Sequence, residues 1–191
     1  MSSKKTALLI VDMQNDFVLE DAPFRVKGAL DAVGNMEKVL QYFRKNNFPI
    51  FHVIRIHRED GCDVEITRKD IFLKTPFAVE GSKGAEIVDE LKPMPKEYVI
   101  KKNRMSAFLN TDIDLILKRL DIEDVVVIGV QTPNCIRATA FDAVAYDYNA
   151  WLVEDAVAAQ TKEIHKANVL DMKNIGIRVI RTEQIENLFN R

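Results

Sequence analysis

The hydrophobic pattern divides the chain into short apolar runs that alternate with longer amphipathic stretches. The short runs, such as residues 124–130, are rich in Val and Ile and indicate strands buried on both faces. The longer stretches repeat apolar residues at three- and four-residue spacing, which indicates helices. The predicted strands cover residues 6–11, 49–55, 98–101, 124–130, 150–154 and 177–180, and the predicted helices cover 29–46, 85–91, 111–120, 133–146, 162–174 and 183–189.

This alternation predicts the fold class. Strands that alternate with helices form parallel sheets with right-handed crossovers and helices on both faces. We therefore expect an α/β protein, a three-layer α/β/α Rossmann-like sandwich with a six-stranded, mainly parallel sheet. No Pro/Gly/Ser-rich linker or internal repeat divides the chain, so residues 1–191 are predicted to form a single domain. The polar stretch 58–82 is long for a plain connection, and loops of this kind usually belong to sites. Its charge-rich part, residues 58–68, favours a solvated loop, a lid or a subunit contact.

Composition narrows the choice of partners and compartment. The 27 Lys and Arg residues and 29 Asp and Glu residues give a net charge of −2 and no basic block, which argues against nucleic acid or an anionic membrane surface as partner. No apolar run approaches the ~20 residues of a membrane span, and the run after Lys5 is too short for a secretory signal. Two separated cysteines, Cys62 and Cys135, give no disulfide framework, so we expect a reducing, cytoplasmic compartment.

Three reactive side chains follow different predicted strands. Asp12 follows the first strand, Lys101 and Lys102 end the third, and Cys135 lies shortly after the fourth, at a helix start. Ligands bind parallel sheets outside the carboxyl ends of the strands. Each residue alone has an ordinary explanation as a loop residue, a solvated lysine or a small core residue. Their coincidence favours a site.

The sequence around Cys135 predicts an activated thiol. With Thr132 as N-cap and Pro133 as first helical residue, the thiol lies in the first helical turn, where free backbone N–H groups favour a thiolate. We therefore expect a lowered thiol pKa. Lys102 would add a positive charge, and Asp12 could take the thiol proton and pass it to a leaving nitrogen.

Four segments together resemble the isochorismatase-like cysteine hydrolases, and they match in order and spacing over nearly the whole chain. The segments are residues 12–17 (Asp-Met-Gln-Asn-Asp-Phe), 102–108 (Lys-Asn-Arg-Met-Ser-Ala-Phe), 129–135 (Gly-Val-Gln-Thr-Pro-Asn-Cys) and 155–156 (Asp-Ala). This family includes nicotinamidases, N-carbamoylsarcosine amidohydrolases, ureidoacrylate and biuret hydrolases, and isochorismatases. The string at residues 131–137 is most similar to a nicotinamidase-like branch.

The resemblance implies a catalytic triad of Asp12, Lys102 and Cys135. Lys102 is preferred over Lys101 because the family's lysine lies four residues before the serine of Ser-Ala-Phe, here Ser106. The family's non-proline cis peptide would fall between Val130 and Gln131 and would aim the backbone N–H groups of Gln131 and Cys135 at one substrate oxygen. No cofactor is implied, and a homo-oligomer, a dimer or tetramer, is expected.

Two departures define the expected branch. Nicotinamidases carry an Asp-x-His-x-His metal segment after the second strand, but residues 55–60 contain one histidine, His57, so no metal site is expected. True isochorismatases lack the cysteine, so Cys135 favours hydrolysis of a C–N bond in a small amide or ureide through a thioester. The motif positions also give candidate substrate-binding residues: Gln14, Phe17, Arg104, Phe108 and Thr132.

Three alternatives stay open at this stage. The chain could be a catalytically silent family member that binds a small molecule or a partner protein, or an atypical nicotinamidase. A dinucleotide-binding Rossmann protein is a weaker reading, because no Gly-x-Gly-x-x-Gly follows the first strand.

Overall fold

A single parallel sheet forms the centre of the computed structural model, which describes residues 5–189. Every neighbouring pair of strands is parallel, and their order across the sheet is β3-β2-β1-β4-β5-β6. The strands are β1 (Thr6–Val11), β2 (Ile50–Arg55), β3 (Tyr98–Lys102), β4 (Asp124–Val130), β5 (Asn149–Ala158) and β6 (Arg178–Ile180). The predicted six-stranded sheet is therefore confirmed, and all of it is parallel.

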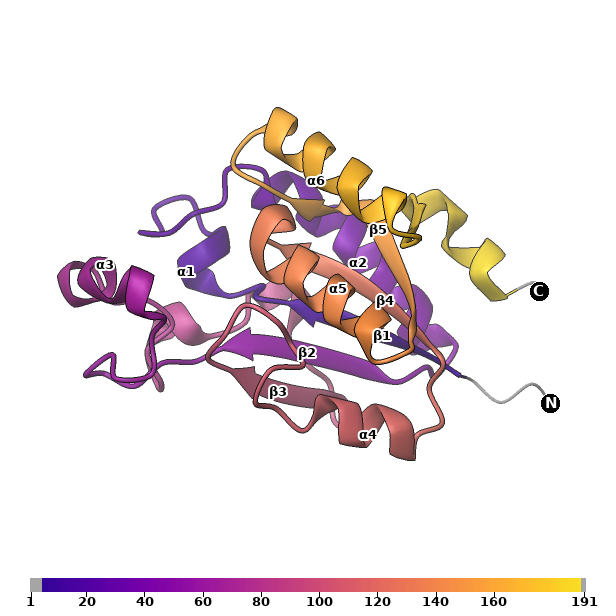
Figure 1. The fold of residues 1–191 in the computed structure, drawn as a ribbon, viewed down its shortest axis with the longest axis horizontal. Coiled ribbons are helices and arrows are strands. Elements are labelled where there is room, and N and C mark those ends of the chain that lie inside the picture. The colour runs from indigo at the N-terminus through magenta and orange to yellow at the C-terminus, as the bar shows by residue number, and fades with distance from the viewer. Residues whose placement is uncertain (1–4, 190–191) are drawn as a thin grey trace.

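Helices cover both faces of the sheet and complete the three layers (Figure 1). Leu8 and Ile10 of β1 pack with helix α2 on one face, while Leu9 and Val11 pack with α4, α5 and α6 on the other. This alternation follows from the two-residue period of a strand. The α-helices are α1 (Asn15–Val18), α2 (Ala29–Lys45), α3 (Lys69–Lys74), α4 (Ile113–Arg119), α5 (Arg137–Ala145) and α6 (Lys162–Asn174). None of the described helices is both long and apolar enough to cross a membrane.

Short helical turns account for most differences from the sequence prediction. The expected helix at 85–91 is two 3₁₀ turns, and the polar stretch after β2 contains a 3₁₀ turn followed by α3. In α3, Phe72 is buried while Ile71 and Leu73 are exposed, so one turn offers no apolar period to detect. The shorter helices are η1 (Ile66–Arg68), η2 (Lys83–Ala85), η3 (Asp89–Leu91), the π-helical turn η4 (Thr132–Ile136) and η5 (Thr182–Phe189).

The chain reverses its direction across the sheet between β1 and β4. From β1 the strand order runs outward to β2 and β3, and from β4 it runs outward to β5 and β6. The loops that follow β1 and β4 therefore separate and leave a crevice, the usual ligand site of such sheets. In Figure 1 the strand arrows point toward the side that carries α1 and α3, and the start of β1 lies at the opposite end.

Candidate active site

A buried ion pair joins the ends of β1 and β3. The Nζ of Lys102 donates to Oδ2 of Asp12 at 2.8 Å and to the backbone carbonyl of Arg104 at 3.1 Å. Neither side chain of the pair is more than 4% exposed to solvent. Lys101, on the other face of β3, instead forms an exposed pair with Glu80. The alternation along β3 thus brings Lys102, the lysine that the sequence favours, to Asp12.

Only one carboxylate oxygen of Asp12 binds Lys102. Its Oδ1 is buried and has no hydrogen-bond partner among residues 5–189. The residue has a φ of 53°, in the left-handed region that Asp tolerates better than most residues. This turn directs the chain out of β1 and places Asp12 among the residues that line a pocket of about 230 Å³.

Cys135 lines the same pocket and belongs to η4, directly before α5. The N-cap is Gln131 rather than Thr132, and Pro133 is the second helical residue. The turn contains a hydrogen bond from the Ile136 N–H to the Gln131 carbonyl, five residues back. The peptide bond between Val130 and Gln131 is cis, as the resemblance predicts. The nucleophile candidate therefore lies in a widened turn at the mouth of the crevice.

The expected lowering of the Cys135 pKa is wrong. Burial raises the pKa of this thiol, and the negative charge of Asp12 raises it further. The positive charges of Lys102 and Arg55 act in the opposite direction but do not outweigh burial. The sequence argument counted the helix start and the lysine, whereas the tertiary structure adds desolvation. A raised pKa favours the protonated thiol over the thiolate.

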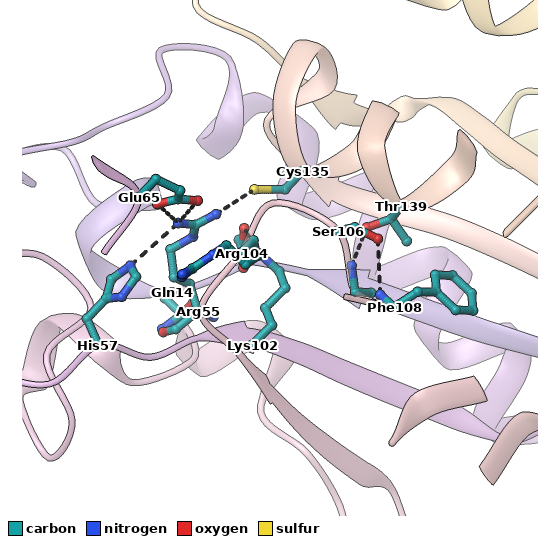
Figure 2. A network of polar contacts seen from close by, with 12 residues as sticks. Gln14, Arg55, His57, Glu65, Lys102, Arg104, Ser106, Phe108, Cys135 and Thr139 are labelled. Carbon is teal, nitrogen blue, oxygen red and sulfur yellow. Dashed lines mark hydrogen bonds and ion pairs between the residues drawn. The ribbon is translucent and has the colours of Figure 1, made fainter. Parts of the chain in front are cut away.

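Arg55, the last residue of β2, connects Cys135 to a buried polar network (Figure 2). Its Nη2 donates to the Sγ of Cys135 at 3.6 Å, and its Nη1 donates to both carboxylate oxygens of Glu65 at 2.9 and 3.0 Å. Only 1% of Arg55 is exposed. The guanidinium is thus a fixed positive charge beside the thiol.

The residues that follow β2 do not fit a metal ion. His57 is buried, and its Nε2 lies 3.5 Å from Nη1 of Arg55. Its Nδ1 lies 3.4 Å from an oxygen of Asp63. A cation bound at Nε2 would meet the guanidinium of Arg55, which is repulsive at such a distance. Within residues 5–189, no group of three or more His, Cys, Asp or Glu side chains is arranged to hold a metal.

The candidate substrate-binding residues separate into two groups. Phe17 lines the pocket, as do Gln131 and Cys135, whose backbone N–H groups were expected to bind a substrate oxygen. Gln14, Arg104, Phe108 and Thr132 do not line it.

These four side chains instead contact other residues of the protein. Gln14 is fully buried and exchanges hydrogen bonds with the backbone of Arg55, so it fixes the end of β2. Thr132 bonds His165 through Oγ1. Figure 2 shows Phe108 pointing away from Arg55, and its ring stacks on Tyr146. Arg104 donates to the backbone carbonyls of Asp63 and Asn103.

The pocket is also lined by three arginines that the sequence did not assign to a site: Arg25, Arg55 and Arg68. Arg55 carried a usable signal, because it lies at the carboxyl end of a strand, as Asp12 and Lys102 do. Arg25 lies in a connection and carried none, and Arg68 was part of the charge-rich stretch 58–68 without being assigned to the site, since only the folded chain brings both to Cys135.

A family model matches the amino-acid sequence over almost the whole chain. Residues 6–184 match the model described as the isochorismatase domain. The chain belongs to the isochorismatase family. The resemblance seen in the motifs is thereby confirmed, and nicotinamidase-like proteins are among the relatives.

Three relatives illustrate the range of the family. A protein of Arabidopsis thaliana named a probable inactive nicotinamidase is 45% identical, with 92% of this chain and 91% of that one covered. An isochorismatase family protein from Desulfovibrio vulgaris is 41% identical over 98% and 99% of the two chains, with a TM-score of 0.95. The N-carbamoylsarcosine amidase of Thermoplasma acidophilum is 32% identical over 93% and 96%, with a TM-score of 0.80.

Proposed function

We propose that this protein is a metal-independent cysteine hydrolase that cleaves a C–N bond of a small amide or ureide. The observation that carries the proposal is the convergence of Cys135 and the buried Asp12–Lys102 pair at one pocket of the topological switch point. Amidohydrolases among the relatives, such as N-carbamoylsarcosine amidase, support the reaction class.

In the proposed first step, Cys135 attacks the carbonyl carbon of the substrate. The free Oδ1 of Asp12 takes the thiol proton as the S–C bond forms, which the raised thiol pKa requires. Backbone N–H groups of Gln131 and Cys135 stabilise the oxyanion. The proton then passes from Asp12 to the leaving nitrogen, the C–N bond breaks, and ammonia or an amine departs from a thioester.

In the second step, water attacks the thioester and Asp12 accepts one of its protons. The C–S bond breaks, the sulfur regains a proton, and a carboxylic acid leaves; from a ureide the product is a carbamic acid. Lys102 holds the Asp12 carboxylate through Oδ2 and keeps Oδ1 directed to the pocket. Arg55 stabilises the thiolate whenever the proton has left.

A screen of ammonia release tests this proposal. The panel compares nicotinamide, N-carbamoyl amino acids, biuret and ureidoacrylate, and we expect turnover of a carbamoyl or ureido compound and negligible turnover of nicotinamide. Cys135→Ala should lower that turnover by roughly 10⁴-fold or more. Asp12→Asn and Lys102→Ala should each be nearly as damaging, because a triad acts as a unit and its losses do not add. Full activity of Cys135→Ala would refute the mechanism.

The same screen separates the two remaining alternatives. The name of the Arabidopsis relative, a probable inactive nicotinamidase, is the reason to keep a catalytically silent protein as an alternative. A silent protein would release no ammonia from any compound. An atypical nicotinamidase would give its highest kcat/KM with nicotinamide, although the Arg55 guanidinium beside His57 disfavours the metal chemistry of nicotinamidases.

A further inference from the structure

The guanidinium of Arg55 lies between the carboxylate of Glu65 and the thiol of Cys135 (Figure 2). Its Nη2 donates to the Sγ of Cys135 at 3.6 Å, whereas its Nη1 donates to both carboxylate oxygens of Glu65 at 2.9 and 3.0 Å. A guanidinium is planar and rigid, so its two terminal nitrogen atoms move together. A change in the position of the Glu65 carboxylate therefore changes the position of the donor that reaches the sulfur.

Glu65 does not line the pocket that Arg55 and Cys135 line. Its side chain is 16% exposed, whereas that of Arg55 is 1% exposed. Burial would raise the pKa of Glu65, but the charge and the hydrogen bonds of Arg55 hold that pKa below its ordinary value, so the carboxylate is ionised at neutral pH. Glu65 is therefore placed to influence the reaction through Arg55 and not by touching a substrate.

The backbone around Glu65 is held by the fold. Val64 is buried in the core, and the carbonyl of Glu65 accepts a hydrogen bond from the Arg68 N–H at 2.8 Å, at the start of η1. Two residues earlier in the chain, Asp63 has a carboxylate oxygen 3.4 Å from Nδ1 of His57. Because the backbone is held on both sides, the length of the Glu65 side chain determines where its carboxylate meets Arg55.

His57 offers Nη1 of Arg55 a second acceptor at a longer distance. Its Nε2 lies 3.5 Å from this nitrogen. Burial lowers the pKa of His57, and the charge of Arg55 lowers it further, which favours the neutral ring. A neutral acceptor at 3.5 Å attracts a guanidinium less than a carboxylate at 2.9 Å does. The orientation of Arg55 is therefore set mainly by Glu65.

We infer that Glu65 is a positioning residue: the reach and the charge of its side chain hold Arg55 so that Nη2 donates to the sulfur of Cys135 during its attack on the substrate. This inference rests on the proposed function, since it assigns a residue to the same reaction. Aspartate at position 65 would keep the charge, but it is one methylene shorter and would draw the guanidinium away from the sulfur or release it. Glu65→Asp therefore separates positioning from charge.

The first experiment follows alkylation of Cys135 by iodoacetamide, which requires no substrate. In a Cys62→Ser background, Cys135 is the sole cysteine of the chain. Glu65→Asp should raise the pH midpoint of alkylation by about one unit, the lower end of what one hydrogen bond to a charged group contributes. Arg55→Met should raise the midpoint at least as far. Glu59→Asp, the same change at an exposed glutamate of the same connection, should leave it unchanged.

A double variant tests whether Glu65 acts through Arg55. In the Arg55→Met background, Glu65→Asp should add no further shift, because the charge at position 65 is kept and the donor to the sulfur is already absent. Loss of folding would be recognised by the opposite change. The thiol of an unfolded chain has its ordinary pKa, which is lower than that of the buried thiol, so unfolding would lower the midpoint.

The second experiment measures hydrolysis of the compound in the ammonia-release panel that the wild type cleaves fastest. Glu65→Asp should lower kcat by about tenfold, which corresponds to the expected shift of one pH unit in the thiol midpoint. KM should change less than about twofold, because Glu65 lies outside the pocket. Glu59→Asp should leave both kinetic parameters unchanged.

The outcomes of the two experiments separate this inference from the proposed function. If no compound is hydrolysed but Glu65→Asp raises the alkylation midpoint only when Arg55 is present, the positioning of Arg55 by Glu65 stands and the proposed hydrolysis fails. If a compound is hydrolysed while Glu65→Asp alters neither kcat nor the midpoint, or shifts the midpoint equally with and without Arg55, the positioning role is refuted and the hydrolase proposal stands.

Discussion

The guanidinium of Arg55 donates a hydrogen bond to the thiol sulfur of Cys135 at 3.6 Å. Both side chains are buried, and Glu65 holds Arg55 through a pair of hydrogen bonds from Nη1. This contact sets a permanent positive charge beside the proposed nucleophile. The charges of both Lys102 and Arg55 oppose the raised pKa of the thiol, but Lys102 also holds Asp12, whereas Arg55 contacts the sulfur itself. The site therefore contains two cations with different tasks.

The pH dependence of alkylation should report the state of Cys135. Burial and the charge of Asp12 raise the thiol pKa, so the protonated form persists above the ordinary pKa of a thiol. In a Cys62→Ser background, the rate of alkylation by iodoacetamide should keep rising with pH beyond that ordinary value. The measurement is the rate of adduct formation, followed by mass spectrometry across a pH series.

Asp12→Asn provides the matched variant for that profile. It removes the negative charge that opposes ionisation of the thiol and leaves the charge of Lys102 uncompensated, so the midpoint should move to lower pH. The same variant should lose hydrolysis, because it removes the proposed base. A profile with an unchanged midpoint would contradict the assigned neighbourhood of Asp12 and Cys135.

Removal of metal ions should leave the rate of hydrolysis unchanged. The position next to His57 where a cation could bind already faces the guanidinium of Arg55. Prolonged dialysis against a chelator, followed by an ammonia-release assay, measures the effect. Stoichiometric metal at His57 together with activity that disappears on its removal would prove this prediction wrong.

Glu97 should stabilise the far end of the sheet in a pH-dependent way. It accepts hydrogen bonds from Arg44 at 2.7 Å and from the Met94 backbone at 2.8 Å, and its Oε2 lies 2.8 Å from Nε2 of His52. Burial would raise the pKa of Glu97, but its hydrogen-bonding partners outweigh burial and hold the pKa below the ordinary value. Glu97→Gln should therefore destabilise the protein at neutral pH by about 1–3 kcal/mol.

The direction of the Glu97 pKa shift determines the pH range in which Glu97 stabilises the protein. A lowered carboxyl pKa gives stability that is present above the pKa of unfolded Glu, about 4.3, and lost as the pH falls through the folded pKa. Urea unfolding at a series of pH values should show the difference between the wild type and Glu97→Gln shrinking below about pH 5. The exposed Glu90 gives the control variant Glu90→Gln, expected to stay within about 0.5 kcal/mol. A difference that is constant with pH would rule out the ionic origin.

Two glycines should respond to alanine in opposite directions. Gly129 of β4 has a φ of +116°, and a Cβ there would lie 2.1 Å from the carbonyl oxygen of Val11. Gly129→Ala should therefore cost about 3 kcal/mol or more, or prevent folding. A Cβ at Gly34, within α2, would meet nothing within 4 Å. Gly34→Ala should stabilise the protein by about 0.5–1 kcal/mol, measured by urea unfolding, and equal effects of the two changes would contradict the structure.

The sequence by itself determined the sheet and the edge where the site lies. Apolar runs and helical periods are local signals, so β1, β4 and α2 could be located to within one or two residues. Because carboxyl ends of parallel strands gather at one edge, Asp12, Lys102 and Cys135 could be expected together. The resemblance favoured Lys102 over Lys101 through its spacing to Ser106.

Only the tertiary structure decided what surrounds these residues. Desolvation depends on the whole fold, and it reverses the expected direction of the Cys135 pKa. Gln14 lies two residues after Asp12 in the sequence, but its side-chain amide forms hydrogen bonds with the backbone of Arg55, which is distant in the chain. Conversely, Arg25 and Arg68 lie in connections without a period, and they reach the pocket because segments distant in sequence pack together there. Local patterns fix which elements form, whereas the charge and burial of a site are properties of contacts that no local pattern encodes.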